Sequence, residues 1–114
     1  MPVRSQNSDN LPMNPTTMSE RLTCVETYLR NTGPTFPNSV MCYDVGLLLK
    51  GMEVESENGS PAVKELVEEI VGSVHALFAT IDTNGPNEVR NIHRNAALRQ
   101  LAALRVYMFE NNLT

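Results

Sequence analysis

Four arginines near the end of the chain are the residues best placed to bind an anionic partner: Arg90, Arg94, Arg99 and Arg105. On a helix turning about 100° per residue, Arg90, Arg94 and Arg105 project within about 60° of one another. Such a row could contact phosphates spaced along a nucleic acid strand. An acidic helix precedes this segment, and an antiparallel arrangement of the two favours ion pairing instead, for Arg105 more than for Arg90. Ion pairing or solvation is the first interpretation and nucleic-acid binding is the alternative.

Two cysteines and two histidines are the other side chains that could support chemistry: Cys24, Cys42, His75 and His93. Together they could form a transition-metal site or a thiol–imidazole pair. They show no Cys-x-x-Cys or His-x-x-x-His spacing, so we expect no metal site, no cofactor and no catalytic residue. The cysteines are predicted to be reduced and packed as small hydrophobic residues. His75 is predicted to border the core with one nitrogen hydrogen-bonded, and His93 to face solvent.

The segment that begins at Asp82 partly matches a calcium-binding loop, with Asn84 at the third position. The match then fails, because Pro86, Asn87 and His93 occupy the fifth, sixth and twelfth positions, where an oxygen ligand, a glycine and a glutamate are required. The segment is therefore predicted to be a turn. The chain has no phosphate-binding glycine loop and no nucleophile elbow, so it is predicted not to be an enzyme.

The composition predicts a small acidic globular domain. The chain has 114 residues, a net charge of −4, 41% hydrophobic residues and 5% aromatic residues. The negative charge argues against bulk attraction to nucleic acid or anionic membranes, and the few aromatic residues argue against a base-stacking platform. No apolar run is long enough for a signal peptide or a membrane span. The protein is predicted to be soluble and intracellular, in the cytoplasm.

The apolar spacing predicts an all-α fold, a small four-helix array or bundle with a flexible N-terminal arm. Residues 1–15 contain three prolines and little to bury, so we expect a disordered arm before a single helical domain over 16–114. Capping residues and Gly-Pro or Asn-Gly breaks divide the domain. The segment after Gly51 is predicted to be an acidic loop. The four predicted helices cover residues 17–31, 39–50, 61–82 and 87–111.

The last predicted helix is apolar on nearly every side, because Ala96–Phe109 reads AALRQLAALRVYMF. Neighbours in a four-helix array bury roughly half to two thirds of one helix, so apolar surface is left over. That surplus predicts a shared interface, although a monomer that wraps this helix more fully is the alternative. Alanines allow close helix approach, and Tyr, Met and Phe are frequent interface anchors. The predicted interface residues are Leu98, Leu101, Ala102, Val106, Tyr107 and Phe109.

These observations together favour a non-enzymatic helical interaction or assembly protein. It is expected to associate with itself, or to dock a protein partner, through its last helix. The alternative is a subunit that binds or coats nucleic acid with Arg90, Arg94, Arg99 and Arg105. No membrane partner is expected.

Overall fold

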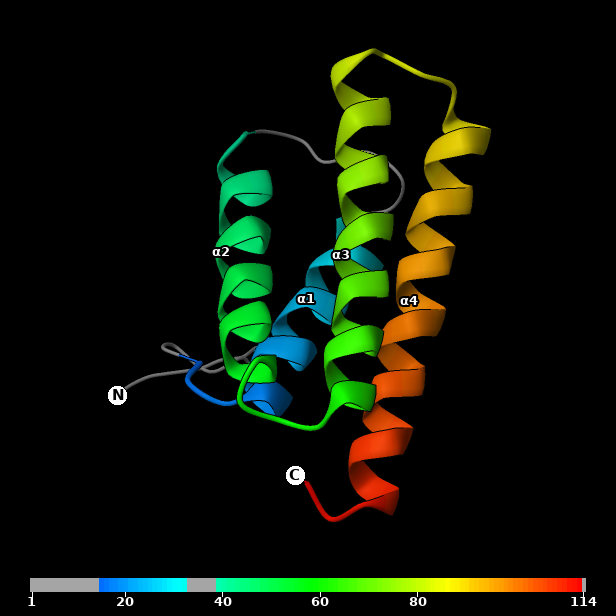
Figure 1. The fold of residues 1–114 in the computed structure, drawn as a ribbon. Coiled ribbons are helices and arrows are strands. Elements are labelled where there is room, and N and C mark those ends of the chain that lie inside the picture. Colours follow the sequence, from blue (N-terminus) through cyan, green and yellow to red (C-terminus); the bar gives the residue numbers. More distant parts are fainter. Residues whose placement is uncertain (1–14, 33–38, 114) are drawn as a thin grey trace, which may run out of the picture.

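The computed structural model describes residues 15–32 and 39–113, and within these residues the chain is all-α and contains no strand (Figure 1). The predicted all-α class and the number of helices are therefore confirmed. The predicted arm over residues 1–15 lies almost wholly outside the described residues. The helices are α1 (Met18–Thr32), α2 (Ser39–Ser56), α3 (Pro61–Asp82) and α4 (Asn87–Glu110).

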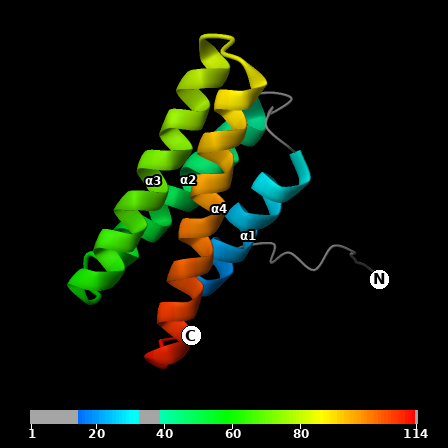
Figure 2. The same ribbon diagram turned by 90° about the vertical axis from the view of Figure 1, so that its right-hand side faces the viewer.

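The four helices form a ring in which each helix packs against two neighbours. Helix α3 packs on α4 and α2, and α1 packs on α2 and α4, whereas the backbones of the diagonal pairs do not approach within 8 Å, Cα to Cα, in the described residues. Successive helices run in opposite directions, and α3 and α4 form a long hairpin (Figures 1 and 2). Short connections favour this up-and-down arrangement of neighbours. One consequence is that every helix keeps a face that its own chain does not cover.

Apolar residues at three- and four-residue spacing supply the core. Helix α1 contributes four buried side chains at this spacing, namely Met18, Leu22, Val25 and Leu29. Helix α3 supplies six more buried side chains, which makes it the main core helix. The core cluster consists of Met18, Leu22, Val25, Leu29, Val45, Leu49, Met52, Val63, Val67, Ile70, Val71, Val74, Leu77, Ala97, Leu101, Leu104 and Met108.

A reciprocal capping box opens α1. The Thr17 hydroxyl accepts a hydrogen bond from the Glu20 amide at 3.1 Å, so Thr17 is the N-cap of the helix. The Glu20 carboxylate accepts the amides of Thr16 at 2.9 Å and Thr17 at 3.3 Å. Each bond satisfies an amide that has no partner inside the helix. The hydrogen bonds donated by the backbone amides of Thr16 and Thr17 hold the pKa of the Glu20 carboxyl below its usual value.

Helix α2 is longer than predicted, so the prediction of an acidic loop after Gly51 was wrong. The helix continues to Ser56, because Met52 and Ser56 extend the buried row of Val45 and Leu49 at helical spacing. Both Met52 and Ser56 are buried. Tertiary packing of these side chains outweighs the low helix propensity of glycine.

The hairpin turn confirms the predicted turn after Asp82. Asn84 adopts a left-handed backbone with φ of 58°. The amides of Asn84 and Gly85 donate to the carbonyls of Ile81 and Thr80, at 3.0 and 2.7 Å. This bond pair is a Schellman motif, in which asparagine takes the position that glycine usually occupies. Ser60 caps α3 at its other end by accepting the Val63 amide at 3.3 Å.

Two helical glycines make a matched test of the packing. A side-chain carbon added at Gly72 meets nothing within 4 Å, so Gly72→Ala is expected to raise the free energy of unfolding by about 0.5–1 kcal/mol. At Gly51 the added carbon collides with the Arg21 side chain, which binds Glu55 at 2.9 Å. Gly51→Ala should therefore gain less stability than Gly72→Ala. Urea unfolding followed by circular dichroism measures both, and an equal gain would contradict the observed packing of Arg21.

The capping box predicts a pH-dependent contribution to stability. Because folding lowers the pKa of Glu20, its carboxylate stabilises the fold above the ordinary glutamate pKa, and this contribution is lost as the pH falls through the lowered value. Glu20→Gln should therefore be less stable than the wild type at neutral pH and equal to it in strongly acidic solution. Urea midpoints of both proteins across the acid range test this. A difference that persists unchanged in acid would contradict the prediction.

Candidate interaction surface

Arg94 joins α4 to the C-terminal end of α1. Its Nε donates to the Leu29 carbonyl at 2.6 Å, and its Nη2 donates to the Arg30 carbonyl at 3.3 Å. These carbonyls lie in the last turn of α1, where the partial negative charge of the helix end favours a cation. Arg94 therefore caps the C-terminal end of α1, although it lies more than sixty positions later in the chain.

Arg105 forms a second link between the same two helices. Its Nη2 lies 2.9 Å from Glu26 Oε1 and 3.3 Å from Thr23 Oγ1. Glu26 also pairs with Arg30 at 3.4 Å. The predicted ion pair of Arg105 with a glutamate of the preceding helix was wrong, because the acid comes from α1. Helix α3 carries three exposed glutamates, Glu65, Glu68 and Glu69. None of them forms an ion pair with another described residue.

Arg90 lies at the hairpin turn and has only 7% of its surface exposed. Its Nε donates to the Gly85 carbonyl at 2.8 Å, and its Nη2 donates to Asn84 Oδ1 at 3.3 Å. It was expected to be less engaged in structure than Arg105, and that expectation was wrong. Buried in this way, Arg90 stabilises the turn whose left-handed residue is Asn84.

The arginine row therefore faces the bundle. Arg90, Arg94 and Arg105 share the side of α4 that carries the buried Leu101 and Met108, so their guanidinium groups reach neighbouring helix ends and side chains. Of the four α4 arginines, only Arg99 has an exposed side chain that makes no hydrogen bond or ion pair to another described residue. One exposed arginine does not form a row of phosphate contacts, so the geometry does not favour the nucleic-acid alternative.

The predicted interface residues divide into three groups. Leu101 is fully buried in the core, which makes it unavailable for an intermolecular contact and corrects its assignment. Leu98 and Tyr107 are partly buried against the core. Ala102 is exposed, Val106 has 54% of its surface exposed and Phe109 has 76%. The neighbouring helices therefore leave part of the predicted surface open.

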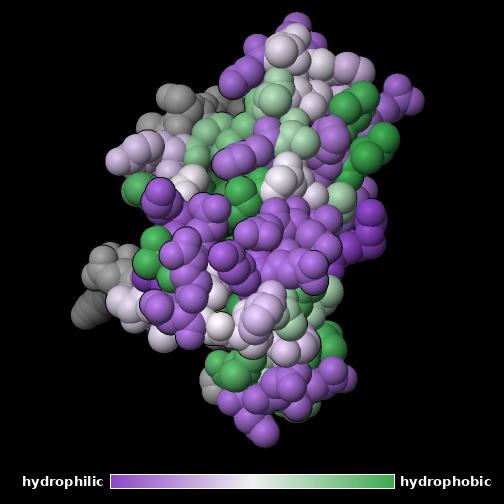
Figure 3. Space-filling view, in the orientation of Figure 1, coloured by the Kyte–Doolittle hydropathy of each residue, from purple (hydrophilic) through white to green (hydrophobic). Residues whose placement is uncertain are grey.

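The open part is a continuous apolar surface on the C-terminal half of α4. Ala102, Ala103, Val106 and Phe109 succeed one another at helical spacing and are all exposed; we call them the α4 patch. A shallow hollow beside the patch is bordered by α3 as well as α4. In Figure 3 the margin where α4 lies shows hydrophobic areas separated by hydrophilic surface. The hollow is lined by Leu66, Arg99, Ala102, Ala103, Val106, Tyr107 and Glu110.

The N-terminal half of the same α4 face is mainly polar. It exposes Glu88, Asn91 and Asn95, with Ile92 as an isolated apolar residue that is 63% exposed. Single exposed hydrophobic residues are normal on protein surfaces, whereas contiguous ones mark interaction sites. The candidate surface is therefore confined to the C-terminal half of α4.

A second exposed apolar row lies on α2 and was missed by the sequence analysis. Tyr43, Leu47 and Val54 are 66%, 55% and 57% exposed and lie on one side of the helix with Lys50. Their spacing of four and seven residues is the signal that could have revealed the row. The prediction that the helix ends near Gly51 obscured it, because Val54 was then assigned to a loop.

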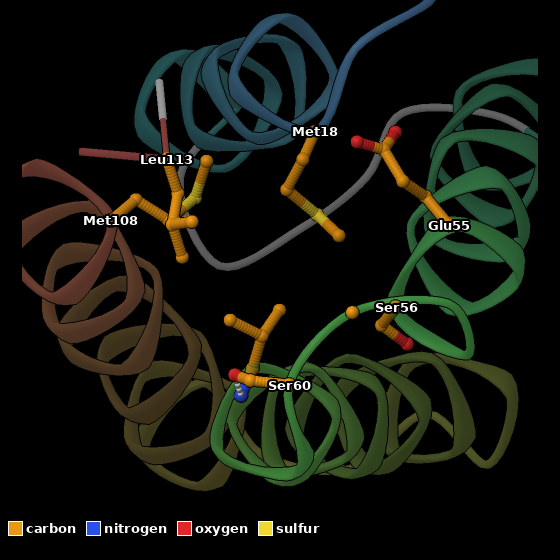
Figure 4. Close-up of a pocket in the computed structure, with 8 residues that line it drawn as sticks. Met18, Glu55, Ser56, Ser60, Met108 and Leu113 are labelled. Carbon is orange, nitrogen blue, oxygen red and sulfur yellow. Dashed lines mark hydrogen bonds between the residues drawn. The ribbon is translucent and has the colours of Figure 1, made fainter. Parts of the chain in front are cut away.

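A small hollow of about 180 Å³ lies at the end of the bundle near both the start of α1 and the end of α4. Met18, Met108 and Leu113 bring apolar side chains to it (Figure 4). Its polar groups already have partners: the Ser56 hydroxyl donates to the Glu53 carbonyl, and Ser60 caps α3. The hollow therefore offers little chemistry for selecting a polar ligand.

The cysteines and histidines do not assemble a reactive site. Burial raises the pKa of both thiols, so neither is activated as a thiolate. Both cysteines are free of disulfide bonds, as predicted. The predicted environments of the histidines were wrong, because His75 is exposed and His93 is half-buried. Among the described residues no group of three His, Cys, Asp or Glu side chains could hold a metal ion.

No family model, curated protein or solved structure matches this chain. None of the helices in the described part of the chain has the length and apolar character needed to span a bilayer.

The different environments of two arginines on one helix can be tested directly. Arg94→Ala is expected to lower the free energy of unfolding by about 1–2 kcal/mol, because two carbonyls at the end of α1 lose their charged donor. Arg99→Ala is the matched control and should change it by less than about 0.5 kcal/mol. Urea unfolding measures both variants at a protein concentration that keeps the chain monomeric, because Arg99 also borders the candidate surface. Equal losses would show that Arg94 does not cap α1 as described.

Proposed function

We propose that the protein is a non-enzymatic helical assembly protein that associates with itself through the α4 patch. The carrying observation is the exposure of Phe109 and Val106 on one continuous apolar face, next to the exposed Ala102 and Ala103. Burying such side chains stabilises an association by roughly 1.5–3 kcal/mol for each large residue. A face of this kind is best explained as one that another protein covers.

Two further features support a protein partner. The small side chains of Ala102 and Ala103 leave room for a second helix to approach closely, and Phe109 is a suitable anchor beside them. The other three α4 arginines already form hydrogen bonds within the bundle; they are Arg90, Arg94 and Arg105. The exposed part of α4 is therefore characterised by apolar residues more than by cationic ones.

Phe109→Glu provides the test of this proposal. The wild type should sediment above the mass of a 12.7 kDa monomer at micromolar concentrations, whereas Phe109→Glu should sediment as a monomer. The reason is that a charge introduced into an apolar contact would lose its hydration on association. Because Phe109 is exposed, the variant should retain the helical circular dichroism of the wild type.

Leu47→Glu on α2 is the matched control, since Leu47 is also an exposed apolar residue, at 55%. It should leave the sedimentation behaviour unchanged. A wild type that remains monomeric up to several hundred micromolar would refute self-association through α4. Loss of association in Leu47→Glu alone would assign the contact to α2 instead.

A further inference from the structure

The α4 patch is bounded by one positive and one negative residue on the same side of the helix. Arg99 precedes the patch and Glu110 follows it, and both are exposed and border the same hollow. They are eleven residues apart, which is three turns of an α-helix and about 17 Å along its axis. Neither forms an ion pair with another described residue. The surface thus carries opposite charges at its two ends with apolar residues between them.

We infer that the partner of the α4 patch is a second copy of this chain, whose α4 lies antiparallel across it with Arg99 of each copy against Glu110 of the other. This inference rests on the proposed function and adds the partner, the direction and the register. A two-fold axis makes the contact self-complementary, so both ion pairs form at once. A parallel pair of α4 helices would instead place arginine against arginine and glutamate against glutamate.

The apolar residues independently favour the same register. When Arg99 lies opposite Glu110 of the second copy, the two-fold axis crosses α4 at the level between Leu104 and Arg105. Val106 then lies opposite Ala103 of the second copy, so a larger side chain meets a small one at both symmetric positions. The overlap covers the apolar half of the α4 face.

An overlap along the whole helix is disfavoured by the same residues. Centring the contact on Arg99 would bring the two Arg99 side chains together, and would press the polar positions Asn91 and Asn95 against the apolar patch. Like charges placed opposite each other are destabilising. The short overlap avoids both costs and leaves the polar half of the face in water.

Charge reversal at two exposed positions tests the register. Arg99→Glu and Glu110→Arg should each weaken self-association tenfold or more, because each places like charges together at both symmetric positions. Combining the two changes in one chain should restore the wild-type dissociation constant to within about threefold. An equimolar mixture of the two single variants should also associate, because each variant then faces the opposite charge. Sedimentation equilibrium measures all four, and circular dichroism checks that each folds.

A second experiment uses the same variants to test direction. The doubly reversed chain should associate with itself but not with the wild type, since its mixed pairs are arginine with arginine and glutamate with glutamate. Energy transfer between labelled chains measures this preference. Free mixing of the two proteins, or single variants that associate as well as the wild type, would overturn the register. A monomeric wild type would refute the proposed function itself, whereas a dimer sensitive only to Phe109→Glu would refute the register alone.

Discussion

The arrangement of helices in a ring is the constraint on which the rest of this structure depends. Each helix packs against two neighbours, so the side of the helix that faces neither neighbour points away from the bundle. A helix whose outer side is polar satisfies this arrangement, as the outer face of α3 does with Lys64, Glu65 and Glu68. Helix α4 does not, because its apolar residues continue around to Val106 and Phe109. The proposed association follows from that difference between two adjacent helices.

The arginines of α4 act mainly as intramolecular connectors. Helix α1 is the shortest of the four and contacts α4 through charged donors as well as apolar packing. Arg94 caps the end of α1, Arg105 pairs with Glu26, and Arg90 supports the hairpin turn. Charge-assisted bonds of this kind fix direction as well as adding stability, because a planar guanidinium must be aligned with its acceptors. These bonds help to orient α4 so that the patch faces outward.

An interface built on the C-terminal half of α4 would leave the rest of the fold unchanged. The patch residues do not contribute to the buried core, whereas Leu101 and Met108 on the opposite side of the same helix do. Under the proposed function, folding and association would therefore use different faces of one element. Substitutions on the outer face can then alter assembly without disturbing the monomer.

The sequence by itself determined the number of helices and the boundaries of α3, because these depend on residues three or four positions apart and on local turn signals. It also indicated the surplus apolar surface of α4.

The sequence did not determine that α2 continues past Gly51, which depends on burying Met52 in the core. Nor could it place Leu101 inside, since a helix that is apolar all round has no preferred side until its neighbours are positioned. The partners of Arg94 and Arg105 were likewise decided by tertiary structure, because Leu29 and Glu26 are brought near only when α1 packs against α4.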